Sequence, residues 1–173
     1  MLVNEKHLTT IWYDNTKDVV QIIDQRFLPF DLKIIELKTL EDFCFAIKEM
    51  QVRGAPLIGV TAAYGMYVAS KTTKNFSELK KAGDSLKSTR PTAVNLSWAV
   101  DKIITEIKDM EKSNLQEIIL SIANEIRDQD IINCKAIGQN GSKLIENIYK
   151  KTQKKVNVLT HCNAGWLATV DWG

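Results

Sequence analysis

The first forty residues carry short apolar runs separated by polar turns, a pattern typical of β-strands. Residues 9–13 and 19–23 form two such runs, and the turn-rich segment 14–18 lies between them. This spacing predicts a hairpin with a loop of several residues. A third run, residues 32–37, follows the break at Pro29. We therefore expect a small antiparallel sheet.

From Thr39 onward the apolar residues recur about every 3.6 positions, which predicts helices. Thr39 and Asp42 have the spacing of a capping box, and an amphipathic helix follows them. A second helix is expected to begin at Pro56, because proline suits the first helical turn, and to run to Met66. This segment is apolar nearly all round and rich in small residues, so we expect it in the middle of a bundle.

Helical patterns continue to residue 149. One helix is expected over residues 76–87 and another from Pro91 onward. Residues 115–126 and 131–149 predict two more, because the pattern is interrupted near residues 128–130 and again at Gly138 and Gly141. Residues 156–160 have the composition of a buried strand, and the first turn of a helix is expected at 166–169. A strand, loop and helix in this order open an α/β domain with a parallel sheet.

The predicted fold class is therefore mixed α and β. Residues 1–150 are expected to form a small N-terminal antiparallel sheet plus a helical bundle. Residues 151–173 are expected to supply the first strand of a Rossmann-like α/β domain that is cut short. A single strand cannot bury itself, and the sequence stops eight residues after Gly165. We therefore expect this chain to be truncated relative to a working fold.

Composition and charge narrow the function classes. The chain is 45% hydrophobic and 25% charged, which is typical of a soluble globular protein. A formal net charge of +2 with interspersed signs argues against nucleic acid, and no apolar run suits a signal peptide or a membrane span. Three widely spaced cysteines and two histidines provide neither a disulfide framework nor a metal site. We expect a cytoplasmic protein with no nucleic-acid or membrane partner.

Two arginines stand beside predicted helix starts. Arg53 and Gly54 precede the helix at Pro56, where free backbone N–H groups and the helix dipole suit an anion. Arg90 precedes Pro91 in the same way, and its guanidinium could meet that of Arg53 on one phosphate. The alternatives remain open. Arg53 is equally compatible with a tight connection between helices, and Arg90 with a solvent-facing side chain beside a helix capped by Thr92.

Cys162 is the third candidate, since ligands of parallel α/β sheets bind beyond the carboxyl ends of the strands. The N-terminus of a following helix would favour its thiolate form. A small buried apolar residue at a strand end is the alternative. His161 would point to the opposite face of the strand, so a Cys/His hydrolase pair is disfavoured. An acid–base or positional role for the thiol is more plausible.

Three segments, taken together and in this order, resemble one known family. Residues 52–65 (VRGAPLIGVTAAYG), 89–101 (TRPTAVNLSWAVD) and 159–169 (LTHCNAGWLAT) are similar to the methylthioribose-1-phosphate isomerases of methionine salvage. Their superfamily also contains ribose-1,5-bisphosphate isomerase and the regulatory subunits of eukaryotic translation initiation factor 2B. Residues 12–29, which include Asp24-Gln25-Arg26, fit the isomerase pattern too. The cysteine of THCN favours the isomerases within the superfamily.

The resemblance implies conversion of an aldose-1-phosphate into a ketose-1-phosphate, without metal or organic cofactor, by a homodimer that binds a small phosphorylated sugar. It implies that four residues hold the phosphate and that Cys162 is one of two catalytic residues; the four are Arg53, Gly54, Ala55 and Arg90. The second catalytic residue, an aspartate, has no counterpart here, because Asp171 is too close to Cys162. We therefore expect this chain to be inactive by itself. The competing interpretations are a non-catalytic subunit like those of initiation factor 2B, a protein like ribose-1,5-bisphosphate isomerase, and an inactive truncated product.

Overall fold

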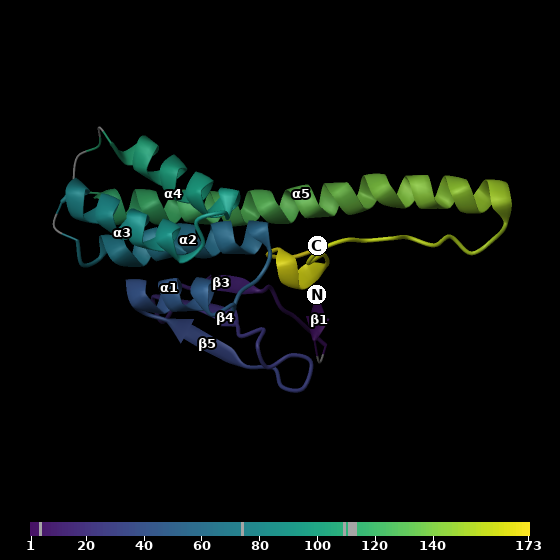
Figure 1. Ribbon diagram of the computed structural model, residues 1–173, viewed down its shortest axis with the longest axis horizontal. Helices are drawn as coiled ribbons and strands as arrows, with labels where there is room; N and C mark the ends of the chain where they lie inside the picture. The colour runs from purple at the N-terminus through teal and green to yellow at the C-terminus, as the bar shows by residue number, and fades with distance from the viewer. Residues whose placement is uncertain (4, 74, 109, 111–113) are drawn as a thin grey trace.

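The computed structural model describes residues 1–3, 5–73, 75–108, 110 and 114–173. A layer of helices covers one face of a small sheet, and one helix extends far beyond both (Figure 1). The ends of the chain lie close together beside this sheet (Figure 1). Among the described residues, no helix is both long and apolar enough to cross a membrane.

The sheets are antiparallel, as the sequence predicts. The main sheet has the order β3-β4-β5, and a separate two-stranded sheet joins β1 to β2. Trp12 lies opposite Gln21 in the main sheet, and its indole N–H donates to the Gln21 side chain at 2.9 Å. The strands are β1 (Leu2–Val3), β2 (Lys6–His7), β3 (Ile11–Asp14), β4 (Val19–Ile23) and β5 (Ile34–Leu37).

Five α-helices and one short 3₁₀ helix, η2, follow among the described residues. The capping box predicted at Thr39 is confirmed: its hydroxyl accepts from the Asp42 N–H at 3.2 Å, and the Asp42 carboxylate accepts from the Thr39 N–H at 2.9 Å. The helices are α1 (Leu40–Lys48), α2 (Ala55–Ser70), α3 (Phe76–Thr89), α4 (Val94–Ile107), α5 (Leu115–Thr152) and η2 (Trp166–Ala168).

Helix α2 is the centre of the bundle, as its apolar sequence predicts. Every residue from Leu57 to Ser70 is buried, and α2 contacts the other four helices. Its small residues make this possible. A Cβ atom at Gly65 would lie 3.2 Å from the side chains of Leu86 and Phe43, so glycine allows α1 and α3 to approach together.

Two helix predictions were wrong. Helix α4 begins at Val94 instead of Pro91, and its N-cap residue Ala93 has no side-chain cap, so Thr92 does not cap it. Helix α5 is one continuous helix through residues 128–130, Gly138 and Gly141. Each of these glycines costs a helix only about 1 kcal/mol relative to alanine, which thirty-eight residues of continuous hydrogen bonding tolerate.

Residues 156–160 form no strand, although their composition predicts one. They are extended and almost wholly exposed, and they run back beside the far half of α5 (Figure 1). A strand needs a neighbouring strand to accept its main-chain hydrogen bonds, and the described residues provide none here.

A polar cluster fastens the β3–β4 turn to α2. The carboxylate of Asp18 accepts hydrogen bonds from the hydroxyls of Tyr13 (2.7 Å) and Tyr67 (2.9 Å) and from the ammonium of Lys71 (2.6 Å). The bond from Lys71, followed by that from Tyr13, lowers the pKa of Asp18 to about 2. The Lys71 ammonium also lies 4.5 Å from the Tyr67 ring centroid, a cation–π contact.

Replacing Asp18 by asparagine should lower the free energy of unfolding near neutral pH by about 0.5–1 kcal/mol. The value is modest because the Asp18 side chain is 59% exposed and its interactions are screened by water. The folded-state pKa lies below the ordinary 3.8, so this stability is present above about pH 4 and is lost as the pH falls toward 2. Urea unfolding at several pH values measures it.

Asp31 provides the matched control. Its side chain is 58% exposed and makes one ion pair, at 3.5 Å, with Lys33. Asp31→Asn should change the free energy of unfolding by less than about 0.3 kcal/mol at neutral pH. Equal losses for the two variants would contradict a special role of the Asp18 cluster.

Candidate active site

One pocket contains every site residue that the sequence suggests. It has a volume of about 550 Å³ and lies between the start of α2, the segment before α4 and the loop at residues 162–163. Five of its lining residues are the predicted ones, namely Arg53, Gly54, Ala55, Arg90 and Cys162. Segments more than one hundred residues apart in sequence thus meet at the N-terminus of one helix.

Arg53, which lines the pocket, has an unused hydrogen-bond donor. One terminal nitrogen of its guanidinium donates to the main-chain oxygen of Gln25 at 2.7 Å. Its Nε–H is buried, and no described residue accepts from it. A buried donor without an acceptor is costly, and an anion in the pocket would satisfy it.

Gly54 brings the start of α2 into contact with the cysteine-bearing segment. Its φ of 93° is a conformation that other residues rarely adopt. A Cβ atom here would also overlap the main chain of Ala168. No side chain caps α2, so its first N–H groups remain available where Ala55 lines the pocket.

Arg90 reaches the pocket from the end of α3. It is half-buried, and its main-chain oxygen accepts from the Ala93 N–H at 2.9 Å, which shapes the turn into α4. Within the described part of the chain, its guanidinium makes no hydrogen bond or ion pair. Thr92 lines the same pocket and is exposed. The absence of a side-chain cap on α4 therefore leaves a second helix start open beside the first.

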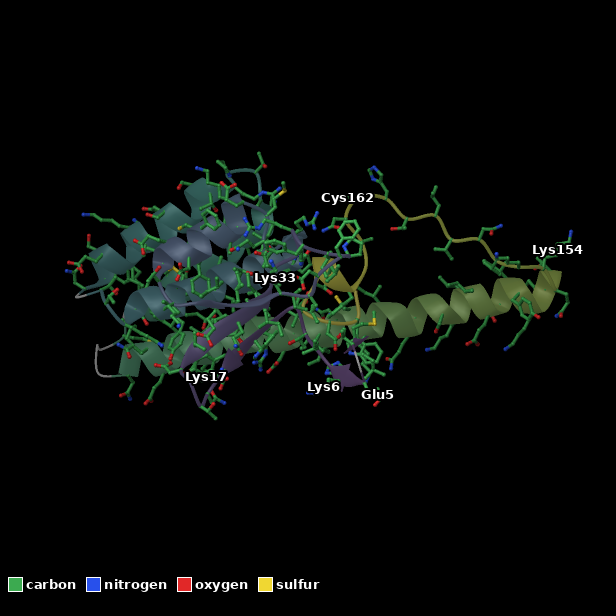
Figure 2. All side chains as sticks on the ribbon, turned by 90° about the horizontal axis from the view of Figure 1, so that it is seen from below. Glu5, Lys6, Lys17, Lys33, Lys154 and Cys162 are labelled. Atoms are coloured by element: carbon green, nitrogen blue, oxygen red, sulfur yellow. The ribbon has the colours of Figure 1, made fainter. Side chains whose placement is uncertain are left out.

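Cys162 lies at the rim of the pocket. Figure 2 shows it where the extended segment from Lys154, at the far end of α5, returns to the body of the protein. The residue is exposed and adopts a φ of 66°. The strand expected directly before Cys162 is not formed by residues 156–160, whereas a helical turn is present where one was expected, as η2 at Trp166–Ala168. His161, being exposed and outside any strand, is not held by the strand alternation assumed for it.

The segment after Cys162 is held by buried polar residues that the sequence analysis did not single out. The Thr10 hydroxyl donates to the main-chain oxygen of Thr169 at 2.6 Å, and the Val170 N–H donates to the Asp130 carboxylate at 2.7 Å. Burial raises the pKa of Asp130. The polar residues 128–130, which suggested a helix break, therefore include an anchor for this segment. The sequence signal for this anchor was the interruption of an apolar helix face by the polar residues 128–130.

Further downstream, Asp171 is 3% exposed and accepts from the N-terminal ammonium at 2.8 Å. It also contacts the His7 ring at 2.7 Å. Among the described residues, no group of three His, Cys, Asp or Glu side chains could hold a metal ion.

The fold and pocket define a mixed α and β domain in which the uncapped starts of α2 and α4 border one pocket that is also lined by a cysteine. The model of the Initiation factor 2 subunit family matches residues 51–170, and the chain belongs to this family. It is 46% identical, over 175 residues, to methylthioribose-1-phosphate isomerase of Rhizobium meliloti (strain 1021), covering 100% of this chain and 48% of that protein. The isomerase of Escherichia coli O45:K1 is 43% identical, with 47% of its length covered.

Two solved structures have a similar fold. The 5-methylthioribose 1-phosphate isomerase of Pyrococcus horikoshii OT3 superposes with a TM-score of 0.75 at 34% identity, over 96% of this chain and 46% of that one. The translation initiation factor eIF-2B, subunit delta, from A. fulgidus gives 0.79 at 35% identity, over 96% and 48%. The chain thus spans about half the length of the relatives it matches.

Substituting alanine for Gly54 should lower the free energy of unfolding by more than about 2 kcal/mol, since alanine meets both an unfavourable φ and the Ala168 main chain. Gly138→Ala is the control, because a Cβ there meets nothing within 4 Å in a helix interior. It should raise the free energy of unfolding by about 0.5–1 kcal/mol. Urea denaturation measures both, and a neutral Gly54→Ala would refute the close approach.

Proposed function

We propose that this chain forms the phosphate-binding part of an aldose-1-phosphate isomerase that converts 5-methylthioribose-1-phosphate into 5-methylthioribulose-1-phosphate. The observation that carries the proposal is the single pocket that contains Arg53, Arg90 and Cys162, with the unsatisfied Nε–H of Arg53 beside it. The similarity to methylthioribose-1-phosphate isomerases and the cysteine within residues 160–163 support this substrate.

The phosphate would be held by the two guanidinium groups and the open N-terminus of α2. Arginine suits this role because its planar fork matches the oxygens of a phosphate and is always charged. Gly54 lets Ala168 pack against the start of α2, and Ala55 would offer its N–H to the phosphate at the uncapped helix start. With the phosphate fixed, C1 and C2 of the sugar would face Cys162 at the rim.

The chemistry requires two events. The anomeric phosphate locks the sugar ring, so a general acid must first protonate the ring oxygen, a role that the resemblance gives to an aspartate. C1 and C2 then exchange oxidation state by movement of hydrogen from C2 to C1. Cys162 would either relay the C2 proton or border an apolar space that favours a direct hydride shift. Both routes leave the atoms and electrons of the sugar balanced.

A second candidate function rests on the similarity to the eIF-2B delta subunit, which superposes as well as the isomerase does. A protein of that class would use the pocket for binding without chemistry. We also propose, from the resemblance, a cytoplasmic homodimer in which residues 151–173 belong to a second structural unit.

Arg53→Lys and Arg90→Lys should each weaken binding of inorganic phosphate by about tenfold or more. An ammonium cannot reproduce two parallel donors, and a charge-assisted contact is worth about 1.5–3 kcal/mol. Isothermal titration calorimetry measures the change. The control is Arg127→Lys. Arg127 lies in α5, where it contacts Asp128 of the same helix and Tyr64 of α2, and it does not line the pocket. Equal affinity in all three variants would disprove the site.

The chain should bind 5-methylthioribose-1-phosphate without turning it over, because the second catalytic residue that the resemblance implies has no counterpart here. Cys162→Ser should leave its affinity within about twofold, since the thiol is placed at the reacting carbons and not at the phosphate. NMR of the sugar protons follows both binding and turnover. Rapid turnover by the chain would contradict the assignment, and tighter binding of nucleoside monophosphates would favour the non-catalytic class.

A further inference from the structure

A buried polar turn follows β4, and the site described so far involves only one of its atoms, the main-chain oxygen of Gln25 that accepts from Arg53. Asp24 and Gln25 are each 1% exposed, and Gln51, which faces them from the segment before α2, is 6% exposed. Polar groups this deep must be hydrogen-bonded, and their partners lie in segments that reach the pocket.

Among the described residues, Gln25 makes three hydrogen bonds, one of them with Arg53, which lines the pocket. Its N–H donates to the Gln51 main-chain oxygen at 2.9 Å, and its own main-chain oxygen accepts from the Arg53 guanidinium at 2.7 Å. Its side-chain amide donates to the Leu167 main-chain oxygen at 2.7 Å. One residue thus holds the anion-binding arginine through its backbone and the cysteine-bearing segment through its side chain.

Asp24 keeps this turn rigid. Its carboxylate accepts from the guanidinium of Arg26 at 3.0 Å and 2.7 Å and from the side-chain amide of Gln51 at 2.8 Å. Burial alone would raise the pKa of Asp24, but the bonds from Arg26 and Gln51 outweigh it and lower the pKa. A charged, doubly fixed carboxylate at this position leaves Gln25 little freedom to move.

If the buried side-chain amide of Gln25 had only to be hydrogen-bonded, any nearby acceptor would be sufficient. Here the acceptor is the carbonyl of η2, and η2 is the element that Gly54 contacts through Ala168. The segment that carries Cys162 is therefore fixed at its downstream end to the same turn that orients Arg53.

We propose that Gln25 is a positioning residue that fixes the distance between the Arg53 guanidinium and the Cys162 loop, and so the reach from the phosphate to the reacting carbons. This assignment rests on the proposed function, because it concerns the same pocket. It adds a residue that touches neither the phosphate nor the sugar.

The test compares Gln25→Leu with Gln21→Leu in the chain. Leucine has nearly the shape of glutamine but cannot donate, so Gln25→Leu releases Leu167. Gln21→Leu removes a side-chain hydrogen bond of similar length, that with Trp12 at 2.9 Å, on the same sheet. Three quantities are measured: the ¹⁵N–¹H resonance of the Arg53 Nε–H, amide exchange at Ala168 and Thr169, and the Kd for inorganic phosphate.

Gln25→Leu should shift the Arg53 Nε–H resonance, speed exchange at Ala168 and Thr169, and weaken phosphate binding. Loss of one hydrogen bond corresponds to roughly 3- to 10-fold in the last two quantities. Gln21→Leu should change none of the three. Unchanged values in folded Gln25→Leu, or equal changes in both variants, would overturn the proposal.

Two further outcomes separate this proposal from the proposed function. If the wild-type chain binds no phosphate while Gln25→Leu still alters Arg53 and the loop, the function fails and the positioning role stands. If phosphate binds and Gln25→Leu changes nothing, only the positioning role fails. Should Gln25→Leu not fold, scalar coupling across the bond from Gln25 Nε2 to the Leu167 carbonyl is sought in the wild-type chain, and its absence would refute the link.

Discussion

The complete burial of α2 is the constraint on which the rest of the structure depends. A helix that is apolar on all sides must be surrounded, and small residues decide how near its neighbours come. A Cβ at Gly59 would lie 3.0 Å from the Asn95 main-chain oxygen, so glycine lets the first turn of α4 touch α2. That contact places the segment carrying Arg90 beside the start of α2. The packing of the core thereby produces the pocket.

The second requirement is to anchor a segment that has no sheet to join. Residues 167–170 are held by hydrogen bonds with three distant parts of the chain, namely Thr10 before β3, Gln25 after β4 and Asp130 in α5. All three partners are polar groups in buried or partly buried surroundings, where an intramolecular hydrogen bond is strongest.

Local patterns predicted most of the fold. The strand alternation of residues 9–23, the capping box at Thr39 and the all-apolar α2 each depend on neighbours in sequence, so each is readable there. The continuity of α5 was missed because each glycine costs a helix only about 1 kcal/mol, which a long run of main-chain hydrogen bonds tolerates. The start of α4 was missed because proline suits the first turn of a helix but does not require a helix to begin there. Residues 156–160 have strand composition, but a strand also needs a partner, which composition does not reveal.

The candidate site was predicted through motifs, and the structure places those residues in one pocket. What the sequence could not provide was the support behind them. Gln25 and Asp130 act through contacts with residues 167 and 170, which lie 142 and 40 positions away. No local pattern encodes such separations. The sequence also does not predict that the Nε–H of Arg53 is buried without an acceptor, because this depends on the three-dimensional structure.

Helix α5 carries the chain far beyond the helical bundle before the chain returns to Cys162. Its buried residues all lie between Ile119 and Ile126, and every side chain from Ser142 to Thr152 is exposed, so its far end is a free arm. These last eleven residues extend about 16 Å, and a tilt of about 10° at their base would move the tip by roughly 3 Å. The chain that leaves this tip at Lys154 leads directly to Cys162. Such a tilt would change the span that residues 153–162 must cover between the end of α5 and the segment held at Leu167.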